Sequence, residues 1–453
     1  TYFIILIGIG WIASRKTEKK PEDYFLANRT FGSLTLFFTL AATNFSAFTF
    51  LGFAGAAYRY GFGQYGIMAV GTALMPIMFY IMGRKIWLLG KEHGYITPPE
   101  LIGARLNSRG LRLLVLLVMV SFTIPYLAIQ AVGAGILLSI SLGIGMKMGA
   151  SITMIVIALY VILGGMRGSG WTDVVQGVIM VTAMLLAVIF VSNSLGGFED
   201  AGLLSFNNKP ELFERPGGGN YFTPQIWFSF MLLWIFVDPM FPQLFSRFYT
   251  AGSQKSLRHS MILYPLLISF LFLIPVLIGV WAHGADIDLG GNIDMVLPLM
   301  VKNYAPPWVF TVVIVGAIAA LMSTADSQLL SLSTMLTRDL ELGNEIRSSK
   351  IVTLLLTFFA LIFVWFGFDP KAGIFSTLVA TTFSGLVVLF PTTFAVLYFK
   401  KISKWACILS IICGELSIYL FRTNILPTFG FLDGILALAI ASIVLITANR
   451  IST

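Results

Sequence analysis

The chain has 453 residues, of which 57% are hydrophobic and only 11% charged, and its formal net charge is +8 at pH 7. A soluble globular protein carries roughly 25% charged residues, whereas apolar runs of about 20 residues, each long enough to span a bilayer core, recur along this chain. These properties exclude soluble enzymes, secreted disulfide scaffolds and disordered chains, and they predict an all-α polytopic membrane protein.

The first apolar run, TYFIILIGIGWIA, begins at Thr1. As a helix it is about 20 Å long, which is too short to span a bilayer. We expect a spanning helix at 1–14 whose outer end precedes this sequence, and not a signal peptide. Apolar runs between charged or Gly- and Pro-rich breaks predict twelve further helices, about thirteen in all. They cover 33–58, 65–89, 111–142, 149–165, 172–194, 224–246, 259–283, 306–337, 350–367, 373–398, 404–421 and 430–449.

The distribution of basic residues predicts the orientation of these helices. One set of alternate loops holds Arg59, Lys147, Lys209, Arg215, Lys302, Lys371 and Arg422. The other loops and the carboxyl end, with Arg247 counted among them, hold the rest of the 29 Lys and Arg residues, roughly three times as many. By the positive-inside rule the amino end lies outside and the carboxyl end in the cytoplasm, which suits a multi-pass protein of the cell membrane. The positive charge is therefore a topology signal and gives no support to nucleic-acid binding.

The loops and the ligand-type residues limit the chemistry. No predicted loop exceeds about 30 residues and no G-x-x-x-x-G-K-S/T phosphate loop occurs, so an ATP-driven pump is excluded for a single chain. The three histidines and two cysteines have no metal-ligand spacing. In TPPELIGARLNS (97–108), Thr97, Pro98 and Glu100 predict a short surface helix that begins with a capping box.

Two predicted helices are interrupted at comparable depth. In the helix at 33–58 the run LAATNFSAFTF places Asn44 and Ser46 in mid-membrane, and in the helix at 224–246 the run WIFVDPMFPQLF does the same with Asp238. Secondary transporters bind solute between two such discontinuous helices, and these two lie five helices apart, as an inverted repeat requires. The alternatives are polar packing between helices for the first and a simple proline kink for the second.

The helix at 306–337 contains AALMSTADSQLLSLS. Four small or hydroxyl-bearing residues share one of its faces at spacings of three and four: Ala320, Ser323, Thr324 and Ser327. Hydroxyl and carbonyl oxygens are hard ligands that suit an alkali cation. Asp326 lies about 60° round from Ser323, and a carboxylate at that depth needs a partner or a cation. The alternative is small-residue packing, with Asp326 paired to a cytoplasmic arginine such as Arg167.

Two more polar residues are open to two interpretations each. Asp173, in GGMRGSGWTDVVQG at the start of the helix at 172–194, fits cation binding and helix capping with Gln176 equally well. Gln130, in the middle of the helix at 111–142, fits a hydrogen bond to solute or one between helices.

Five motifs, in this order, resemble the sodium/solute symporter family, which holds the bacterial sodium/proline symporters and the sodium/glucose cotransporters. They are EDYFLANRTFG (22–32), ATNFSAFTFLGFAG (42–55), GGMRGSGWTDVVQG (164–177), PQLFSR (242–247) and LMSTADSQLL (321–330). The resemblance implies a leucine-transporter-like 5+5 inverted-repeat core with one extra N-terminal helix and two C-terminal helices. A single transporter domain would then cover 1–453, with repeats at 33–194 and 224–398 and peripheral helices at 404–449.

The resemblance also implies a sodium site, formed by the backbone carbonyls of Ala42, Phe45 and Ala320 and the hydroxyls of Ser323 and Thr324. Some members of the family have a further sodium site, and the matching positions are Asp173, Asp326 and Ser327. Several members carry Ser or Thr where this chain has Asp326. The site would therefore be more anionic here, which either tightens cation binding or admits a proton.

The motifs indicate the class of solute less specifically than they indicate the family. Sugar-transporting members carry a Tyr-Trp pair where this chain has Val237 and Asp238, whereas Pro242 and Arg247 resemble the proline, pantothenate and monocarboxylate branches. Free N–H groups at broken helix ends suit a carboxylate, so we expect an amino acid or an organic acid. The residues expected to bind it are Asn44, Ser46, Gln130, Trp234 and Asp238.

The leading hypothesis is a sodium-driven symporter that takes up a small organic solute, with sodium as coupling ion and with no organic cofactor or obligatory protein partner. A proton-coupled symporter of the same fold is the first alternative, motivated by Asp326 and Asp173. A solute sensor is the second, although this sequence ends without a signalling kinase. A membrane-embedded enzyme lacks any nucleophile–base or metal constellation.

Overall fold

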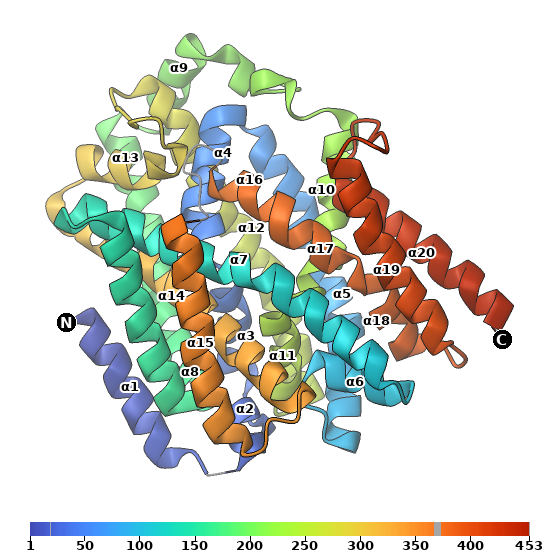
Figure 1. The fold of residues 1–453 in the computed structure, drawn as a ribbon. Coiled ribbons are helices and arrows are strands. Elements are labelled where there is room, and N and C mark those ends of the chain that lie inside the picture. Colours follow the sequence, from blue (N-terminus) through green and yellow to red (C-terminus); the bar gives the residue numbers. More distant parts are fainter. Residues whose placement is uncertain (19, 367–372, 453) are drawn as a thin grey trace.

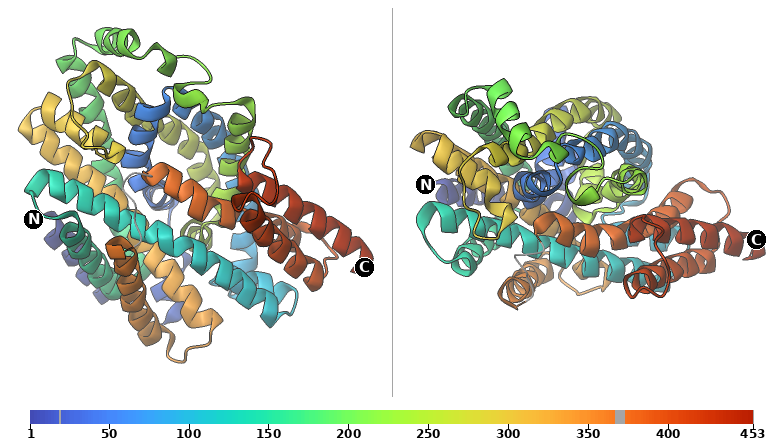
Figure 2. Two further views of the ribbon diagram at one scale, coloured as in Figure 1. Left: turned by 45° about the horizontal axis from the view of Figure 1, so that its top comes forward. Right: turned by 90° about the horizontal axis from the view of Figure 1, so that it is seen from above.

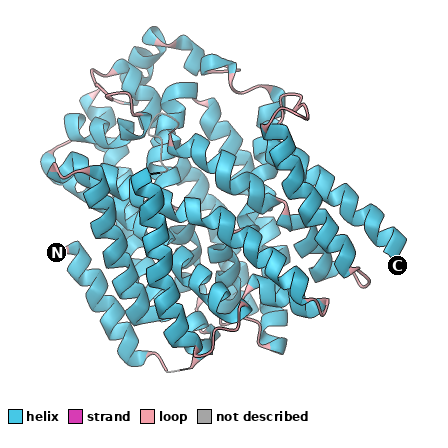
Figure 3. Ribbon diagram, in the orientation of Figure 1, coloured by secondary structure: helices cyan, strands magenta, loops and turns pink. Residues whose placement is uncertain are grey.

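The computed structural model describes residues 1–18, 20–366 and 373–452. Across these residues the regular structure is helical and contains no strand (Figure 3), apart from one isolated bridge between Phe31 and Ala251. The predicted all-helical architecture is confirmed. Residue 367, the last of the predicted helix at 350–367, lies outside the described residues.

The helices follow one another along the whole chain (Figure 1). In order they are α1 (Tyr2–Lys16), α2 (Pro21–Leu26), α3 (Ser33–Asn44), α4 (Phe53–Tyr60), α5 (Gly63–His93), α6 (Pro98–Arg105), α7 (Arg109–Leu142), α8 (Met146–Ser194), α9 (Phe198–Asn208), α10 (Pro224–Val237), α11 (Pro242–Thr250), α12 (Gln254–Trp281), α13 (Val296–Tyr304), α14 (Pro307–Asp339), α15 (Glu345–Phe366), α16 (Ile374–Leu378), α17 (Ser384–Val387), α18 (Leu389–Tyr398), α19 (Lys404–Arg422) and α20 (Asp433–Ser452). Eight short 3₁₀ or π segments lie between them in the described residues, of which three interrupt membrane helices: η2 (Phe48–Gly52), η5 (Asp238–Met240) and η8 (Val379–Phe383).

The helix α14 forms the centre of the bundle. Every residue from 316 to 335 is buried, and a helix that is buried on all faces lies in a core and not at a surface. At opposite edges, α1 packs on α8 and α19 packs on α20 (Figures 1 and 2). The outer helices expose large apolar side chains such as Leu266, Phe358 and Ile443. This surface suits lipid and not water, so the chain is an integral membrane protein.

The count of membrane spans depends on how bent helices are treated. In the described part of the chain, nine helices are long and apolar enough to span a membrane, or eleven if each of two bent pairs is one span. The helix α8 covers two of the predicted helices, and α1 has only 15 residues. The exact number of thirteen and the orientation in the membrane stay predictions.

The break in α8 corrects one predicted boundary. The sequence predicts a loop at 166–171, between helices at 149–165 and 172–194, but these residues are helical and only Gly165 departs from helical geometry (φ 52°, ψ −148°). Tyr160 and Ser169, on either side of Gly165, both donate hydrogen bonds to Asp326. In a straight helix they would be about 13 Å apart along the axis, so the chain folds back at Gly165.

We expect Gly165→Ala to destabilise the protein strongly. The left-handed backbone region is strained for any residue with a Cβ, and a Cβ here would lie 2.6 Å from the carbonyl oxygen of Tyr24. The measurement is thermal unfolding of the purified protein in detergent. Gly8→Ala is the matched control, because its Cβ would meet nothing within 4 Å and alanine favours the helix. Equal unfolding temperatures for the two variants would contradict this account of the break.

The predicted surface helix at 97–108 is confirmed as α6, together with its capping box. The hydroxyl oxygen of Thr97 accepts a hydrogen bond from the Glu100 N–H, and the Glu100 carboxylate accepts one from the Thr97 N–H. The same hydroxyl donates to the carboxylate of Asp339 at the last residue of α14. The cap therefore also ties α6 to the end of the central helix.

Candidate ion and solute site

The two helices predicted to be discontinuous are broken where the sequence indicates. The pair Ser33–Asn44 and Phe48–Tyr60 is bent by 56°, and so is the pair Pro224–Met240 and Pro242–Thr250. The extended residues are Phe45 (ψ 112°) in the first break and Phe241 (ψ 123°) in the second. The alternative of polar packing in an unbroken first helix is therefore excluded. The alternative of a simple proline kink is also excluded for the second helix, because its backbone is extended at Phe241.

The local sequence explains why each helix stops. In the second break Pro239 and Pro242 each lack an N–H; Pro239 is the second residue of η5 and Pro242 the first residue of α11. In the first break the polar side chain of Ser46 takes over a backbone role, because its Oγ accepts a hydrogen bond from the Phe48 N–H at 3.2 Å. The Ala47 N–H donates to Oε1 of Gln130 at 2.9 Å.

These contacts correct one expectation about the first break. The N–H groups at the start of its second half are not free for a solute carboxylate. Besides those of Ala47 and Phe48, the N–H groups of Thr49 and Phe50 donate to the Ser46 carbonyl at 3.0 and 3.2 Å. An anion would have to displace these bonds, so this helix end offers it little.

The five oxygens assigned to the sodium site lie together between the first break and α14. Ser323 Oγ is 2.9 Å from the carbonyl oxygens of both Ala42 and Ala320. Thr324 Oγ1 is 2.9 Å from the Phe45 oxygen and 3.2 Å from the Ala320 oxygen. All five residues are buried. The cluster contains only hard oxygen donors, as an alkali cation prefers.

The origin of this cluster is the interruption of the helix. The last carbonyls of a helix have no partner within it. Here the Ala42 oxygen lies beside the Ser323 hydroxyl and the Thr43 oxygen 3.0 Å from the Thr324 hydroxyl. A cation bound between the two hydroxyls would satisfy the same carbonyls. The break and the serine–threonine pair of α14 therefore form one unit.

The side chains assigned to the solute surround the two breaks. Asn44 Nδ2 donates to Asp238 Oδ2 at 3.3 Å and to the Tyr264 hydroxyl at 2.5 Å, which joins the two breaks. Ser46 Oγ is 3.1 Å from the Tyr126 hydroxyl. Both ends of the Gln130 amide are bound to protein backbone, at the Ala47 N–H and at the carbonyl of its own helix four residues back. Gln130 therefore holds the break in place.

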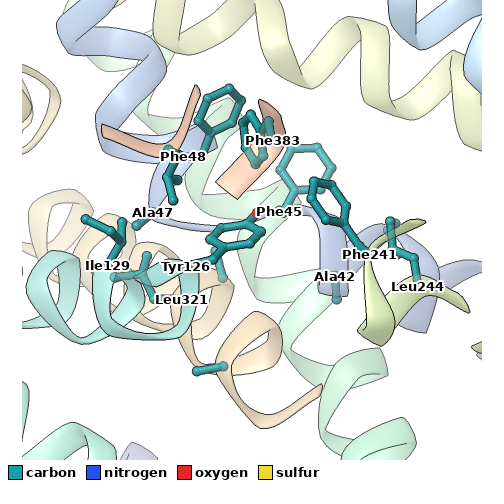
Figure 4. Packing of buried hydrophobic residues seen from close by; sticks show 14 of the residues in the cluster. Ala42, Phe45, Ala47, Phe48, Tyr126, Ile129, Phe241, Leu244, Leu321 and Phe383 are labelled. Carbon is teal, nitrogen blue, oxygen red and sulfur yellow. The ribbon is translucent and has the colours of Figure 1, made fainter. Parts of the chain in front are cut away.

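Aromatic side chains pack near the two breaks, among them Phe45 in the first and Phe241 in the second (Figure 4). Phe48 and Phe383 pack edge to face with centroids 5.4 Å apart, and Tyr126 lies 5.7 Å from Phe241. The Trp234 ring lies 5.6 Å from Phe48 and 5.5 Å from Phe383. Its buried indole N–H has no protein partner among the described residues. An unpaired buried donor is costly in a membrane interior, so this N–H is available to a ligand.

The residues assigned to the second cation site lie together, and two of them, Asp326 and Ser327, follow Thr324 on α14 within one helical turn. Asp326 accepts hydrogen bonds from Tyr160, Ser169 and Ser327 at 2.9, 3.0 and 3.0 Å. Asp173 accepts a hydrogen bond from the Thr39 hydroxyl and forms an ion pair with Arg247, whose Nη2 lies 3.0 Å from its Oδ2. Both carboxylates are fully buried.

Arg247 changes the charge of this cluster. The same Nη2 that binds Asp173 also donates to Ser169 at 2.7 Å and to Ser327, and Nη1 contacts the Met166 sulfur. The side chain is 1% exposed. The sequence analysis counted Arg247 with the cytoplasmic loops because it ended the helix at residue 246, but α11 continues to Thr250. That assignment is wrong.

Two alternatives for the carboxylates are also wrong. Arg167 does not pair with Asp326; its Nη2 pairs at 2.6 Å with Asp23, which is buried at the start of α2. Asp173 does not cap a helix, because it lies eight residues beyond the break at Gly165 and its described partners are Thr39 and Arg247. Both carboxylates belong to one cluster in the middle of the bundle.

The sequence analysis missed several side chains that complete the two sites: Thr39, Tyr160, Ser169, Arg247 and Tyr264. Arg247 carried a signal, because an ionisable residue directly after a predicted membrane helix can lie inside it when the helix boundary is uncertain by a turn. The hydroxyl-bearing residues carried none, since serine, threonine and tyrosine are common in membrane helices for packing alone.

Two broken helices beside a central helix that is buried from residue 316 to 335, with an oxygen cluster at one break, define a secondary transporter of the inverted-repeat class. The model of the sodium:solute symporter family matches residues 24–414, so the chain belongs to this family of sodium-coupled membrane transporters. The sodium/pantothenate symporter of Escherichia coli is 29% identical over 469 residues, which cover 100% of this chain and 95% of that protein.

Other similarities agree with the family and the fold. The sodium/proline symporter of Escherichia coli is 27% identical and covers 75% of this chain and 68% of its own length. Among solved structures, a Na⁺-coupled sialic acid symporter in a substrate-bound, outward-open state superposes with a TM-score of 0.81 at 19% identity, covering 100% of this chain and 95% of that one. The leucine-transporter-like architecture is confirmed, whereas the boundaries of the two repeats stay a prediction.

Proposed function

We propose that this protein takes up a small organic solute, an amino acid or an organic acid, by coupling it to inward sodium flow at the cluster of Ala42, Phe45, Ala320, Ser323 and Thr324. The observation that carries the proposal is the arrangement of these five oxygens, which converge between the first break and α14. A cation bound there links the two halves of the fold that must move relative to one another in alternating access.

The geometry explains how an ion and a solute would depend on each other. The Phe45 carbonyl belongs to the ion cluster, while its two neighbours, Asn44 and Ser46, are assigned to the solute and hydrogen-bond to Asp238 and Tyr126. A cation that fixes the backbone at Phe45 therefore also fixes both side chains. By linkage, a solute that needs these side chains in place must strengthen cation binding by the same factor.

A second cation is proposed for the deeper cluster of Asp173, Asp326 and Ser327. Arg247 neutralises one of the two carboxylates there, so one negative charge is left. The oxygens of Asp326 face four hydroxyl groups, those of Tyr160, Ser169, Thr172 and Ser327. The second ion is sodium in our proposal, and the alternative is a proton on Asp326, which would give a symporter with mixed coupling.

The test is binding and transport with the ions exchanged. Purified protein is screened against amino and organic acids by thermal shift with and without sodium, because anything that binds the folded state raises its apparent stability. A solute that stabilises only with sodium is then followed in proteoliposomes. We expect uptake to require an inward sodium gradient at every pH. Equal uptake in sodium-free buffer at acid pH would overturn sodium coupling in favour of protons.

A further inference from the structure

The carboxylate of Asp238 stands apart from the other buried acids of the transport site. It is 3% exposed and lies in the second break, and among the described residues it accepts a hydrogen bond from Asn44 Nδ2 alone, at 3.3 Å. That amide is shared with the Tyr264 hydroxyl. Asp173 is paired with Arg247 and Asp326 accepts hydrogen bonds from four hydroxyl groups, whereas no ion pair of the described residues includes Asp238.

The ends of the broken helices add to this negative charge. The helices α3 and α10 end at Asn44 and Val237, next to the carboxylate. A helix C-terminus carries the equivalent of about half a negative charge. The opposing positive end of the first break is less available, since the Ala47 and Phe48 N–H groups are bound within the protein. The carboxylate of Asp238 and the two helix C-termini next to it therefore favour a cation.

The surrounding rings also suit a cation. Trp234 lies one helical turn before Asp238, and Tyr126 and Phe241 pack together near the second break (Figure 4). Aromatic faces attract a desolvated ammonium through their electron-rich surfaces. An anion is not attracted to the same electron-rich faces.

We propose that Asp238 binds the protonated amine of the solute, so that the transported compound is an amino acid or another amine-bearing zwitterion and not a simple carboxylate anion. The inference rests on the proposed function and narrows its solute class. The ammonium donates to the Asp238 carboxylate, Asn44 orients that carboxylate, and the aromatic rings cover the remaining face of the ammonium.

The test compares compounds that differ only in the amine. Thermal shift is measured in saturating sodium with L-amino acids, with their 2-hydroxy counterparts (L-alanine beside L-lactate), with L-proline beside cyclopentanecarboxylate, and with pantothenate, which has a carboxylate and no amine. We expect stabilisation by at least one amine-bearing compound and by none of the amine-free ones. A charge-assisted hydrogen bond of this kind is worth roughly a 10- to 100-fold change in affinity.

Variants of Asp238 complete the test. Asp238→Asn should weaken binding of the amine 10- to 100-fold, and Asp238→Glu, which keeps the charge, should retain the preference for an amine. Glu415→Gln is the matched control, because it removes a carboxylate on the peripheral helix α19. Stabilisation by sodium alone reports that each variant is folded and that the ion site works.

Three results would overturn the proposal. One is stabilisation of the wild type by a hydroxy acid or by pantothenate as strong as that by the amine. Another is unchanged binding in Asp238→Asn. The third is the absence of any effect of the amines while sodium alone still stabilises the protein. A failure of sodium itself to stabilise the protein would instead contradict the proposed function.

Discussion

Ser323→Ala and Thr324→Ala are each expected to raise the sodium concentration for half-saturation about 10- to 100-fold, which is the range for losing one strong contact to a charged group. Each hydroxyl lies within 3.2 Å of carbonyl oxygens from two different helices. Its loss removes one ligand and also leaves a buried carbonyl without a partner. The measurement is binding of ²²Na⁺ to purified protein, which requires no knowledge of the solute.

The controls separate ligand loss from damage to the helix. Thr334→Ala removes a hydroxyl from the same helix about 15 Å further along, where its one hydrogen bond among the described residues goes to the carbonyl of its own helix one turn back. It should leave sodium affinity unchanged. Thr324→Ser keeps the ligand oxygen and should stay within about threefold of the wild type. If both alanine variants bound sodium like the wild type, the site between the first break and α14 would be wrong.

The parts of this site that follow from the sequence are those with a strong local signal. Apolar runs show where helices exist, and polar or proline-rich interruptions inside them show where two helices break, because a backbone group in lipid must find a partner. The serine and threonine of α14 share a face through helical spacing alone. The facing carbonyls of Ala42 and Phe45 came from the resemblance to the family.

The parts that do not follow from the sequence depend on distant partners. The segment 166–171 contains two glycines and an arginine, which is typical of a loop, yet it is helical and Arg167 forms an ion pair with Asp23, which is distant in the sequence. The N–H groups after the first break look free until Gln130, 83 residues away, accepts one of them. No local sequence pattern predicts a contact between residues so far apart in the sequence.

The charge of the deep cluster leads to a second expected result. Two carboxylates, Asp173 and Asp326, face one guanidinium, that of Arg247, and all three side chains are buried. Removing the guanidinium alone, in Arg247→Gln, leaves two buried carboxylates without a cation and should cost about 3–5 kcal/mol of stability. The double variant Asp173→Asn/Arg247→Gln removes one charge of each sign and should recover most of that loss in thermal unfolding.

The same variants are expected to set the number of bound ions. The cluster has one net negative charge in the wild type and in Asp173→Asn/Arg247→Gln, but none in Asp326→Asn or in Asp173→Asn. We therefore expect the wild type and Asp173→Asn/Arg247→Gln to bind two sodium ions per protein at saturation, with a Hill coefficient above one. Asp326→Asn and Asp173→Asn should each bind one sodium ion, at the first break, with a Hill coefficient near one. Asp173→Asn is the sharper case, because it loses the second ion although Asp326 is intact.

The ion count decides how far the solute can be concentrated. One sodium ion moved inward through ~100 mV yields about 2.3 kcal/mol, and a tenfold sodium gradient adds about 1.4 kcal/mol, so one ion per zwitterion supports roughly 500-fold accumulation. Two ions square that figure, and two charges then cross the membrane with each zwitterion. If the wild type binds one sodium ion and moves one charge, Arg247 has taken the place of the second cation. If it binds one sodium ion but moves two charges, and the extra charge is lost in Asp326→Asn, the second coupling ion is a proton on Asp326.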